Sequence, residues 1–432
     1  MTTARLCRVF LRRRVGGVCN RKEFSTLLSA LETFPDIPET TPTPAKASTA
    51  SVSKLSNGVT VVTEDACASS TIAMTFPKGG SSQETLSETG AALANQYLSF
   101  KSGSGLSAAL IIRNIEDDGA TPFASADRMG AVVGYTCAPD KAARLLPLLV
   151  ATSSYEKWDV RDAIAAAKEE ASNASTDAQA LLTEHIYAAS YGAQSPLGKP
   201  LYSPVADKSA VQSFRDRAYG LKGAVLSATG IADHAEFCAA VEESFSDAEP
   251  GTDEPLVVTP YAGGESRVMA SSGYAHVALA FEGPSDSALA SVVENYLTLV
   301  SGDATTGFAS PSGLVGLYAA VPSGSAGGLV DSFCSAVTAS VDTEVVERAK
   351  QMAKAQAIFA LDGSSRSIAA AMAASVLESG TFGASSLVST YDSLTVEDVK
   401  AAIEGMAKSK PSLAAVGDIT LIPYHGSIVT RF

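Results

Sequence analysis

The sequence lacks the local motifs that most enzymes need for metal, redox or nucleophilic chemistry. Only four of its 432 residues are histidine, and no two of them lie close enough in the chain to form a local metal clip. The six cysteines show no C-x-x-C spacing, which argues against an iron–sulfur cluster, haem attachment or a disulfide framework. There is no G-x-S-x-G nucleophile elbow. These absences argue against the commonest routes to catalysis.

Two stretches approach phosphate-binding motifs and miss their defining residues. Gly192–Lys199 has the glycine and lysine of a P-loop, but five residues separate its glycines, and Pro200 replaces the hydroxyl that would reach magnesium. Gly103–Gly105 follows an expected helix instead of a strand and lacks the third glycine of a dinucleotide fingerprint. We expect turns at both places and no nucleotide cofactor.

The histidines are expected to be packed, hydrogen-bonded or surface residues and not metal ligands. Glu184 and His185 match the end of an H-x-x-E-H element, but Leu181 occupies the position of its first histidine. A single imidazole on a helix cannot hold zinc, which takes three or four ligands. His276 lies in an alternating run and is expected to be a hydrogen-bonded core or edge residue. These histidines therefore predict no metal site.

No apolar run is long enough to cross a membrane. Stretches such as Leu145–Val150 and Ile368–Val376 fall short of the ~18–20 apolar residues that a spanning helix needs. We therefore expect a soluble or peripheral protein. With 432 residues, 46% of them hydrophobic, the chain has the length and apolar content of two domains of ~100–200 residues each.

Residues 1–22 differ in composition from the rest of the chain. They contain seven Lys or Arg residues and no acid, interleaved with Leu, Val and Phe. This composition is typical of a mitochondrial transit peptide, with a basic arm for nucleic acid or a membrane surface as the alternative. If these seven bases are removed, 25 of the 32 basic residues remain together with 46 acidic residues, and the net charge is near −21. Such a charge argues against nucleic acid and suits a soluble face or a basic protein partner.

The remainder of the chain carries an internal repeat. Gln96–Gly103 returns 199 residues later as Asn295–Gly302, with Tyr, Leu, Ser and Gly in register. Two shorter echoes keep the same order, namely Phe76–Gly79 with Phe281–Gly283 and Val225–Gly230 with Leu413–Gly417. Three echoes in one order predict a duplicated domain. Any chemistry would then lie in one copy, in the other, or between them.

Composition also indicates the boundaries of the two copies. Residues 23–50 are polar and dotted with proline, so we expect a linker or a loosely packed arm. Residues 247–260 include an acidic stretch with Pro and Gly that is typical of an interdomain connection. The predicted domains are residues 51–246 and 261–432.

Both halves mix strands and helices without a regular β-α-β alternation. Strand-like runs at Leu55–Val62 and Gly273–Phe281 are each followed by a helical stretch, Ser87–Lys101 in the first half and Ser287–Val300 in the second. Further helix is expected at Trp158–Tyr191 and at Thr343–Leu361. We predict an α+β fold of two duplicated domains, each a mostly antiparallel sheet packed with helices.

Several motifs in the correct order resemble the pitrilysin-type family. They are the duplicated halves, Leu55–Val59, the Lys78–Ser81 turn with Gly90 after it, and His185–Tyr191 followed by Leu201–Pro204. This family includes the subunits of the mitochondrial processing peptidase and the core proteins of ubiquinol–cytochrome c reductase, respiratory complex III. The resemblance runs from about residue 51 to the end, and Tyr261–Arg267 with Tyr274–Leu279 are most similar to the core proteins.

Active members of the family carry an inverted zinc motif, H-x-x-E-H, on the first helix of the first half. Two histidines bind zinc, and the glutamate activates the attacking water. The resemblance places these three chemical positions at Leu93, Gln96 and Tyr97. Leu93 cannot ligate, Gln96 cannot act as a general base, and the phenol of Tyr97 stays protonated at neutral pH. The resemblance therefore implies a degenerate site with no catalytic and no metal-binding residue.

Two further stretches bear on what the resemblance implies. The third zinc ligand of such enzymes would fall near Glu169 and Glu170, which we interpret as a solvated helix face. In the non-catalytic subunit of the processing peptidase, a glycine-rich loop after the first helix of the second half handles the presequence. The corresponding stretch, Ser301–Ser310, keeps only two glycines and lacks the run that would give such a loop its mobility.

The resemblance thus implies a non-catalytic subunit and leaves two functions open. The first is a core subunit of complex III that acts as a scaffold and binds no cofactor, peripheral on the matrix side of the mitochondrial inner membrane. Its expected partners are a homologous core protein 1, cytochrome b, cytochrome c1 and the Rieske subunit in a dimeric complex. The second is the alpha-type subunit of the processing peptidase, free or integrated in complex III, which helps a zinc-bearing beta subunit to bind presequences. Neither function involves nucleic acid.

Overall fold

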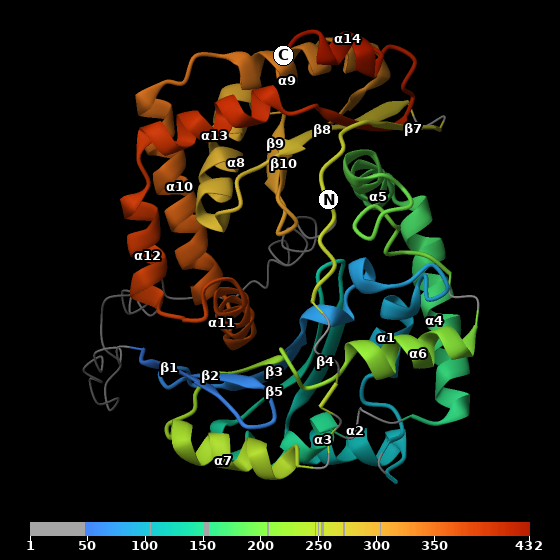
Figure 1. The fold of residues 1–432 in the computed structure, drawn as a ribbon, viewed down its shortest axis with the longest axis vertical. Coiled ribbons are helices and arrows are strands. Elements are labelled where there is room, and N and C mark those ends of the chain that lie inside the picture. Colours follow the sequence, from blue (N-terminus) through green and yellow to red (C-terminus); the bar gives the residue numbers. More distant parts are fainter. Residues whose placement is uncertain are drawn as a thin grey trace, which may run out of the picture. The chain divides into compact units, whose positions relative to one another are not determined.

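Two β-sheets, one in each half of the chain, organise the protein, as Figure 1 shows. The computed structural model describes residues 48–432 apart from residues 104, 151–154, 205–206, 247, 249, 252–254, 271–272 and 303. The predicted transit peptide and all but the last three residues of the predicted arm lie outside the described residues. The described residues belong to one unit, residues 47–432.

The first sheet has six strands in the order β1-β2-β6-β3-β5-β4. Neighbouring strands are antiparallel except for the parallel pair β2 and β6. The strands are β1 Ala50–Lys54, β2 Thr60–Glu64, β3 Ser70–Phe76, β4 Thr121–Ala126, β5 Ala131–Cys137 and β6 Val225–Ala228.

The second sheet repeats this plan with five strands in the order β7-β11-β8-β10-β9, of which only β7 and β11 are parallel. Its strands are β7 Glu265–Met269, β8 Tyr274–Glu282, β9 Thr306–Ala309, β10 Leu314–Pro322 and β11 Ser412–Gly417. The order corresponds strand for strand to β2-β6-β3-β5-β4. The sequence echoes fall on matching elements, at the ends of β3 and β8 and on β6 and β11. The predicted duplication and α+β class are confirmed.

The helices of the first half are α1 Ala91–Leu98, α2 Ala108–Asp117, α3 Leu146–Val150, α4 Lys157–Thr176, α5 Ala178–Tyr191, α6 Lys208–Ala218 and α7 His234–Ser244. Those of the second half are α8 Ser287–Ser301, α9 Ala326–Thr338, α10 Thr343–Asp362, α11 Ser365–Ser379, α12 Ala384–Ser393, α13 Val396–Lys408 and α14 His425–Val429.

Alternation along the strands supplies each sheet with two apolar faces. In β8, Val277 and Leu279 pack into the core formed with α8, α9, α10 and α13, while Ala278 and Ala280 face the other side. The first sheet likewise packs residues such as Ile72 against a core that includes α2, α3 and α7. The alternating run that contains His276 thus forms a strand with both faces packed.

A helix from the opposite half covers the second face of each sheet (Figure 1). Leu182 and Ile186 of α5 pack on β8 and β11 in the second sheet. Met372 and Val376 of α11 pack on β2 and β6 in the first sheet. Because burying a side chain of this size contributes about 1.5–3 kcal/mol, the exchanged helices tie the two halves together.

The helix predicted over Trp158–Tyr191 is two helices, α4 and α5. Asp177 separates them because its carboxylate accepts the N–H of Gln179 at 2.9 Å and so caps the start of α5. The helix predicted over Ser87–Lys101 is shorter than expected and begins only after Gly90.

Candidate functional site

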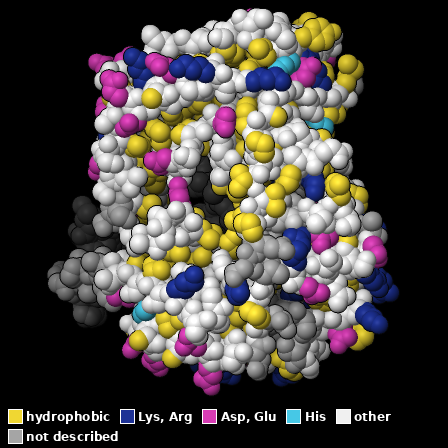
Figure 2. All heavy atoms as spheres, in the orientation of Figure 1, with side chains coloured by type: hydrophobic (Ala, Val, Ile, Leu, Met, Phe, Trp, Pro, Cys, Tyr) yellow, Lys and Arg dark blue, Asp and Glu magenta, His cyan; other side chains and the backbone are white. Residues whose placement is uncertain are grey.

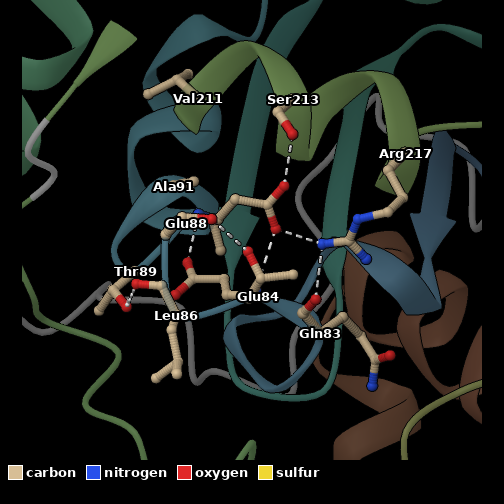
Figure 3. Close-up of polar contacts among 12 residues, drawn as sticks. Gln83, Glu84, Leu86, Glu88, Thr89, Ala91, Val211, Ser213 and Arg217 are labelled. Atoms are coloured by element: carbon tan, nitrogen blue, oxygen red, sulfur yellow. Dashed lines mark hydrogen bonds and ion pairs between the residues drawn. The ribbon is translucent and has the colours of Figure 1, made fainter. Parts of the chain in front are cut away.

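Helix α1 holds the three positions that the family resemblance singles out. It begins after Gly90, whose φ of 83° lies in the left-handed region that glycine tolerates best. The carboxylate of Glu84 accepts the backbone N–H groups of Gly90 at 2.9 Å and Ala92 at 2.7 Å. Figure 3 shows this carboxylate beneath the first turn of α1. Glu84 therefore fixes where the helix starts.

The surroundings of Glu84 are unusually enclosed for a carboxylate. The residue is 4% exposed, and burial raises its pKa to about 7 even though the two backbone N–H groups and the charge of Lys199 act in the opposite direction. Lys199 is itself buried and donates from Nζ to the carbonyl oxygen of Glu84 at 2.9 Å. Lys199, at the end of the stretch Gly192–Lys199, thus supplies a structural contact to the segment before α1.

A second carboxylate joins the turn before α1 to α6 (Figure 3). Glu88 accepts hydrogen bonds from Ser213 at 2.7 Å and from Arg217 at 2.5 Å. Burial acts to raise the pKa of Glu88, but hydrogen bonds from Ser213, Thr85 and Arg217 outweigh it and lower that pKa. The ionised Glu88 therefore anchors the turn that precedes α1.

Leu93, the first of the three positions, is a core residue. Its side chain is 1% exposed. It packs in a cluster with buried residues of α1, α4 and α6, namely Ala94, Leu98, Val160, Ala163, Ala167 and Val211. An apolar contact of this kind leaves no atom that could bind a metal or a substrate polar group.

Tyr97, the third position, reaches across to α4. Its hydroxyl donates to Oε2 of Glu170 at 2.8 Å. Burial and this hydrogen bond raise the pKa of the Tyr97 phenol to about 12, so the phenol is protonated at neutral pH. Glu169 is exposed, as expected, but Glu170 is half-buried and hydrogen-bonded. The interpretation of Glu170 as part of a solvated face was therefore wrong.

Gln96, the second position, contacts the first sheet. Its Oε1 accepts the backbone N–H of Ala126, the last residue of β4, at 2.9 Å. Together the three motif positions contact α4, α6 and β4. Among the residues that the structure describes, no group of three or more His, Cys, Asp or Glu side chains is arranged to hold a metal ion.

Glu184 and His185 of α5, which match the end of the zinc motif, also make structural contacts. His185 Nδ1 lies 2.7 Å from Ser266 Oγ in β7, and burial lowers the pKa of the imidazole. The carboxylate of Glu184 accepts hydrogen bonds from the guanidinium of Arg128 at 2.5 Å and from the backbone N–H of Leu201 at 2.9 Å. His276 lies 3.0 Å from the hydroxyl of Tyr318. The predictions of a packed or surface residue at His185 and of a hydrogen-bonded strand residue at His276 are confirmed.

The described residues of the stretch Ser301–Ser310 include the end of a helix and a short strand. Helix α8 ends at Ser301, and β9 occupies Thr306–Ala309. Ser310 hydrogen-bonds through its side chain to Tyr187 of α5. A cavity of about 340 Å³ lies between α5 and β9, lined by Leu182, Ile186, Phe308 and Tyr318 among others. Figure 2 shows one face of the protein, with hydrophobic side chains around a hollow near its centre.

The chain is similar in sequence to three curated mitochondrial proteins. It is 23% identical over 395 residues to "Mitochondrial-processing peptidase subunit alpha-2" of Dictyostelium discoideum, with 82% of this chain and 88% of the relative covered. It is 25% identical over 434 residues to "Mitochondrial-processing peptidase subunit alpha" of Solanum tuberosum, with 88% and 84% covered. The family resemblance is confirmed. No protein-family model matches the chain.

The "Probable mitochondrial-processing peptidase subunit alpha-2, chloroplastic/mitochondrial" of Arabidopsis thaliana is 26% identical to the chain over 431 residues, again with 88% and 84% covered. In fold, the chain is similar to a chain of the solved structure "Complex III2 from Candida albicans, Inz-5 bound", with a TM-score of 0.75 and 19% identity. That match covers 88% of this chain and 99% of the other. The likeness in fold therefore extends over both sheets.

Among the described residues, no helix is both long and apolar enough to cross a bilayer.

Proposed function

We propose that this chain is a non-catalytic core subunit of mitochondrial respiratory complex III, of the core protein 2 type. In this role it acts as a scaffold that supports assembly and the transfer of electrons from ubiquinol to cytochrome c. The observation that carries the proposal is the likeness in fold to a complex III chain, 99% of which is covered. The α1 contacts support it because each former reactive position now holds the domain together.

The physical argument against catalysis concerns what zinc hydrolysis requires. A catalytic zinc site needs three protein ligands and an open position, and its general base must reach the bound water. At these places Leu93 is in the core, Gln96 binds a backbone amide, and Tyr97 donates to Glu170. Glu170 is the one acid among these four side chains, and it already accepts a hydrogen bond. A peptidase mechanism has no residue here to begin from.

The proposed location rests on the likeness to mitochondrial proteins. The chain would lie on the matrix side of the inner membrane, bound to it only through other subunits. The expected neighbours are a homologous core protein 1 together with cytochrome b, cytochrome c1 and the Rieske subunit in a dimeric complex. The mitochondrial relatives and the fold likeness support this placement.

An alternative function is favoured by the sequence comparisons. The curated relatives are alpha subunits of the mitochondrial-processing peptidase, with 23% and 25% identity over most of their length. The chain would then help a zinc-bearing beta subunit to bind presequences, either free or within complex III. Against this alternative, Ser301–Ser310 lacks a glycine run, and its last residues form β9 and a contact to α5.

A cleavage assay tests the non-catalytic assignment. The chain is purified with its native partners and incubated with a fluorogenic presequence peptide, with and without a zinc chelator. We expect that Gln96→Glu on its own produces no cleavage, because both metal-binding imidazoles are still absent. Chelator-sensitive cleavage that depends on Gln96→Glu would contradict the assignment of the α1 positions. Chelator-sensitive cleavage by the wild-type complex would favour the processing-peptidase alternative.

A further inference from the structure

Two outer strands, β4 and β9, occupy corresponding positions in the two sheets. Each lies at the end of its sheet, β4 beyond β5 and β9 beyond β10. An outer strand presents a row of N–H and C=O groups to which another extended chain can add by backbone pairing. An outward N–H group of β4 or β9 that already donates to a side chain is therefore not available to an added peptide strand.

In β4, two of the outward positions offer no free donor. The hairpin bond from Asp127 N–H to the carbonyl of Gly130, at 2.9 Å, shows which amides point toward β5. Because amides alternate along a strand, those of residues 122, 124 and 126 point outward. Position 122 is proline and has no N–H. The N–H of Ala126 donates to Oε1 of Gln96 at 2.9 Å.

The same closure occurs in β9 with a different side chain. The N–H of Ser310 donates to the carbonyl oxygen of Leu314 at 2.8 Å and so points toward β10. Because amides alternate along a strand, the amide of Gly307 points outward from the sheet. That amide donates to Oγ1 of Thr298 in α8 at 2.9 Å. The Thr298 hydroxyl in turn donates to the carbonyl of Glu294 at 2.9 Å, which leaves its lone pairs directed toward Gly307.

Glycine at position 307 permits this close approach. A Cβ atom there would lie 2.4 Å from the carbonyl oxygen of Glu294 and 2.6 Å from Oγ1 of Thr298. Any larger residue would therefore force β9 away from α8. The strand is held against the helix by its backbone.

The two contacts arise from matching helices but not from matching residues. Gln96 and Thr298 lie on α1 and α8, the helices that carry the repeated segment, but Thr298 aligns with Ser99, about one turn beyond Gln96. Different side chains thus make the same contact in the two copies. Recurrence by different means favours a role for the contact itself.

We propose that Gln96 and Thr298 are edge caps, side chains that exclude extended peptides from strand addition to β4 and β9. Gln96 thus occupies the family's general-base position and closes the neighbouring sheet edge. The edge caps are contacts within the chain, so they do not depend on which assembly the chain belongs to.

Amide hydrogen exchange of the full chain tests the caps directly. Gln96→Ala should speed exchange of the Ala126 amide, and Thr298→Val that of Gly307, each at least about fivefold, the factor expected for losing one hydrogen bond. Amides of β8, followed in the same spectra, report any global unfolding. Unchanged exchange at Ala126 and Gly307 would overturn the proposal.

The matched controls are chosen from the same chain. Gln212→Ala removes an exposed glutamine of α6. Thr338→Val removes a hydroxyl that, like that of Thr298, donates to the carbonyl four residues earlier at 2.9 Å. Neither control should alter exchange at Ala126 or Gly307.

A binding experiment tests the exclusion. The probe is a fluorescein-labelled peptide of alternating Thr and Val, about six residues long like a typical strand. The double variant Gln96→Ala, Pro122→Val should bind it at least about tenfold more tightly than wild type by anisotropy, because two outward donors of β4 are freed. Equal binding by wild type and the double variant, or no binding by either, would overturn the exclusion.

Discussion

The core role assigned to Leu93 predicts a large loss of stability on truncation. Leu93→Ala removes most of a side chain that is 1% exposed and surrounded by residues of α4 and α6. Leucine-to-alanine changes in cores cost about 2–5 kcal/mol, depending on how far the site collapses. Here the facing residues include Ala163 and Ala167, whose short side chains are fixed to the α4 backbone and cannot fill the gap. We therefore expect about 3 kcal/mol.

Urea unfolding followed by circular dichroism measures this loss. The matched control is Leu110→Ala in α2, where the side chain is 42% exposed and truncation should cost less than about 1 kcal/mol. For one unit of residues 47–432, unfolding entropy of about 2.1 cal/mol/K per residue means that a loss of about 3 kcal/mol should also lower Tm by roughly 4 °C. If the two variants lose the same small amount of stability, Leu93 is not a packing residue and the account of α1 is wrong.

Three further changes have expected outcomes in the same assay. Tyr97→Phe removes the 2.8 Å bond to Glu170 and should lower the free energy of unfolding by about 1 kcal/mol; an unchanged urea midpoint would contradict that bond. Burial raises the pKa of Glu84 from 4.5 to about 7, so the folded chain holds a proton that the unfolded chain releases between these pH values. The contribution of Glu84 is therefore greatest below pH 4.5 and is lost as pH rises to about 7, by up to about 3 kcal/mol. Glu84→Gln should remove this slope, and a slope identical to wild type would refute the shift. Arg215 is 4% exposed, and its Nε has no hydrogen-bond partner among the described residues. Its Nη1 donates to Oδ1 of Asn95 at 3.4 Å. Arg215→Met removes the buried charge at the loss of this one long hydrogen bond, so it should raise stability by about 1 kcal/mol, and a lower urea midpoint would contradict this.

The elements that could be predicted from the sequence are those with a strong local signal. The alternation in β8 predicts its two faces, and Asp286 before α8 caps that helix as its residue type suggests. The break between α4 and α5 was missed although Asp177, a favoured capping residue, stands at the junction. The exchange of α5 and α11 between the halves could not be predicted, because each helix packs on a sheet built from a distant part of the sequence.

At the candidate site, the sequence indicates which side chains replace the reactive ones but not what those side chains contact. Gln96 bonds to an amide 30 residues away, and Tyr97 bonds to a carboxylate 73 residues away. Neither contact has a local pattern, because both arise from the packing of α1 against β4 and α4. The edge cap by Thr298 was missed for the same reason, since a threonine within a helix carries no signal for a strand nearby.

The central claim is that this chain is a scaffold of complex III, and its most direct test is the haem content of the assembly that contains it. The affinity-tagged chain is purified from detergent-solubilised mitochondria of its source, and a reduced-minus-oxidised absorbance spectrum is recorded. We predict that the spectrum shows the bands of both b-type and c-type haem. We also predict that both haems and ubiquinol–cytochrome c reductase activity elute together with the tagged chain. A haem-free heterodimer that cleaves presequences would contradict the claim.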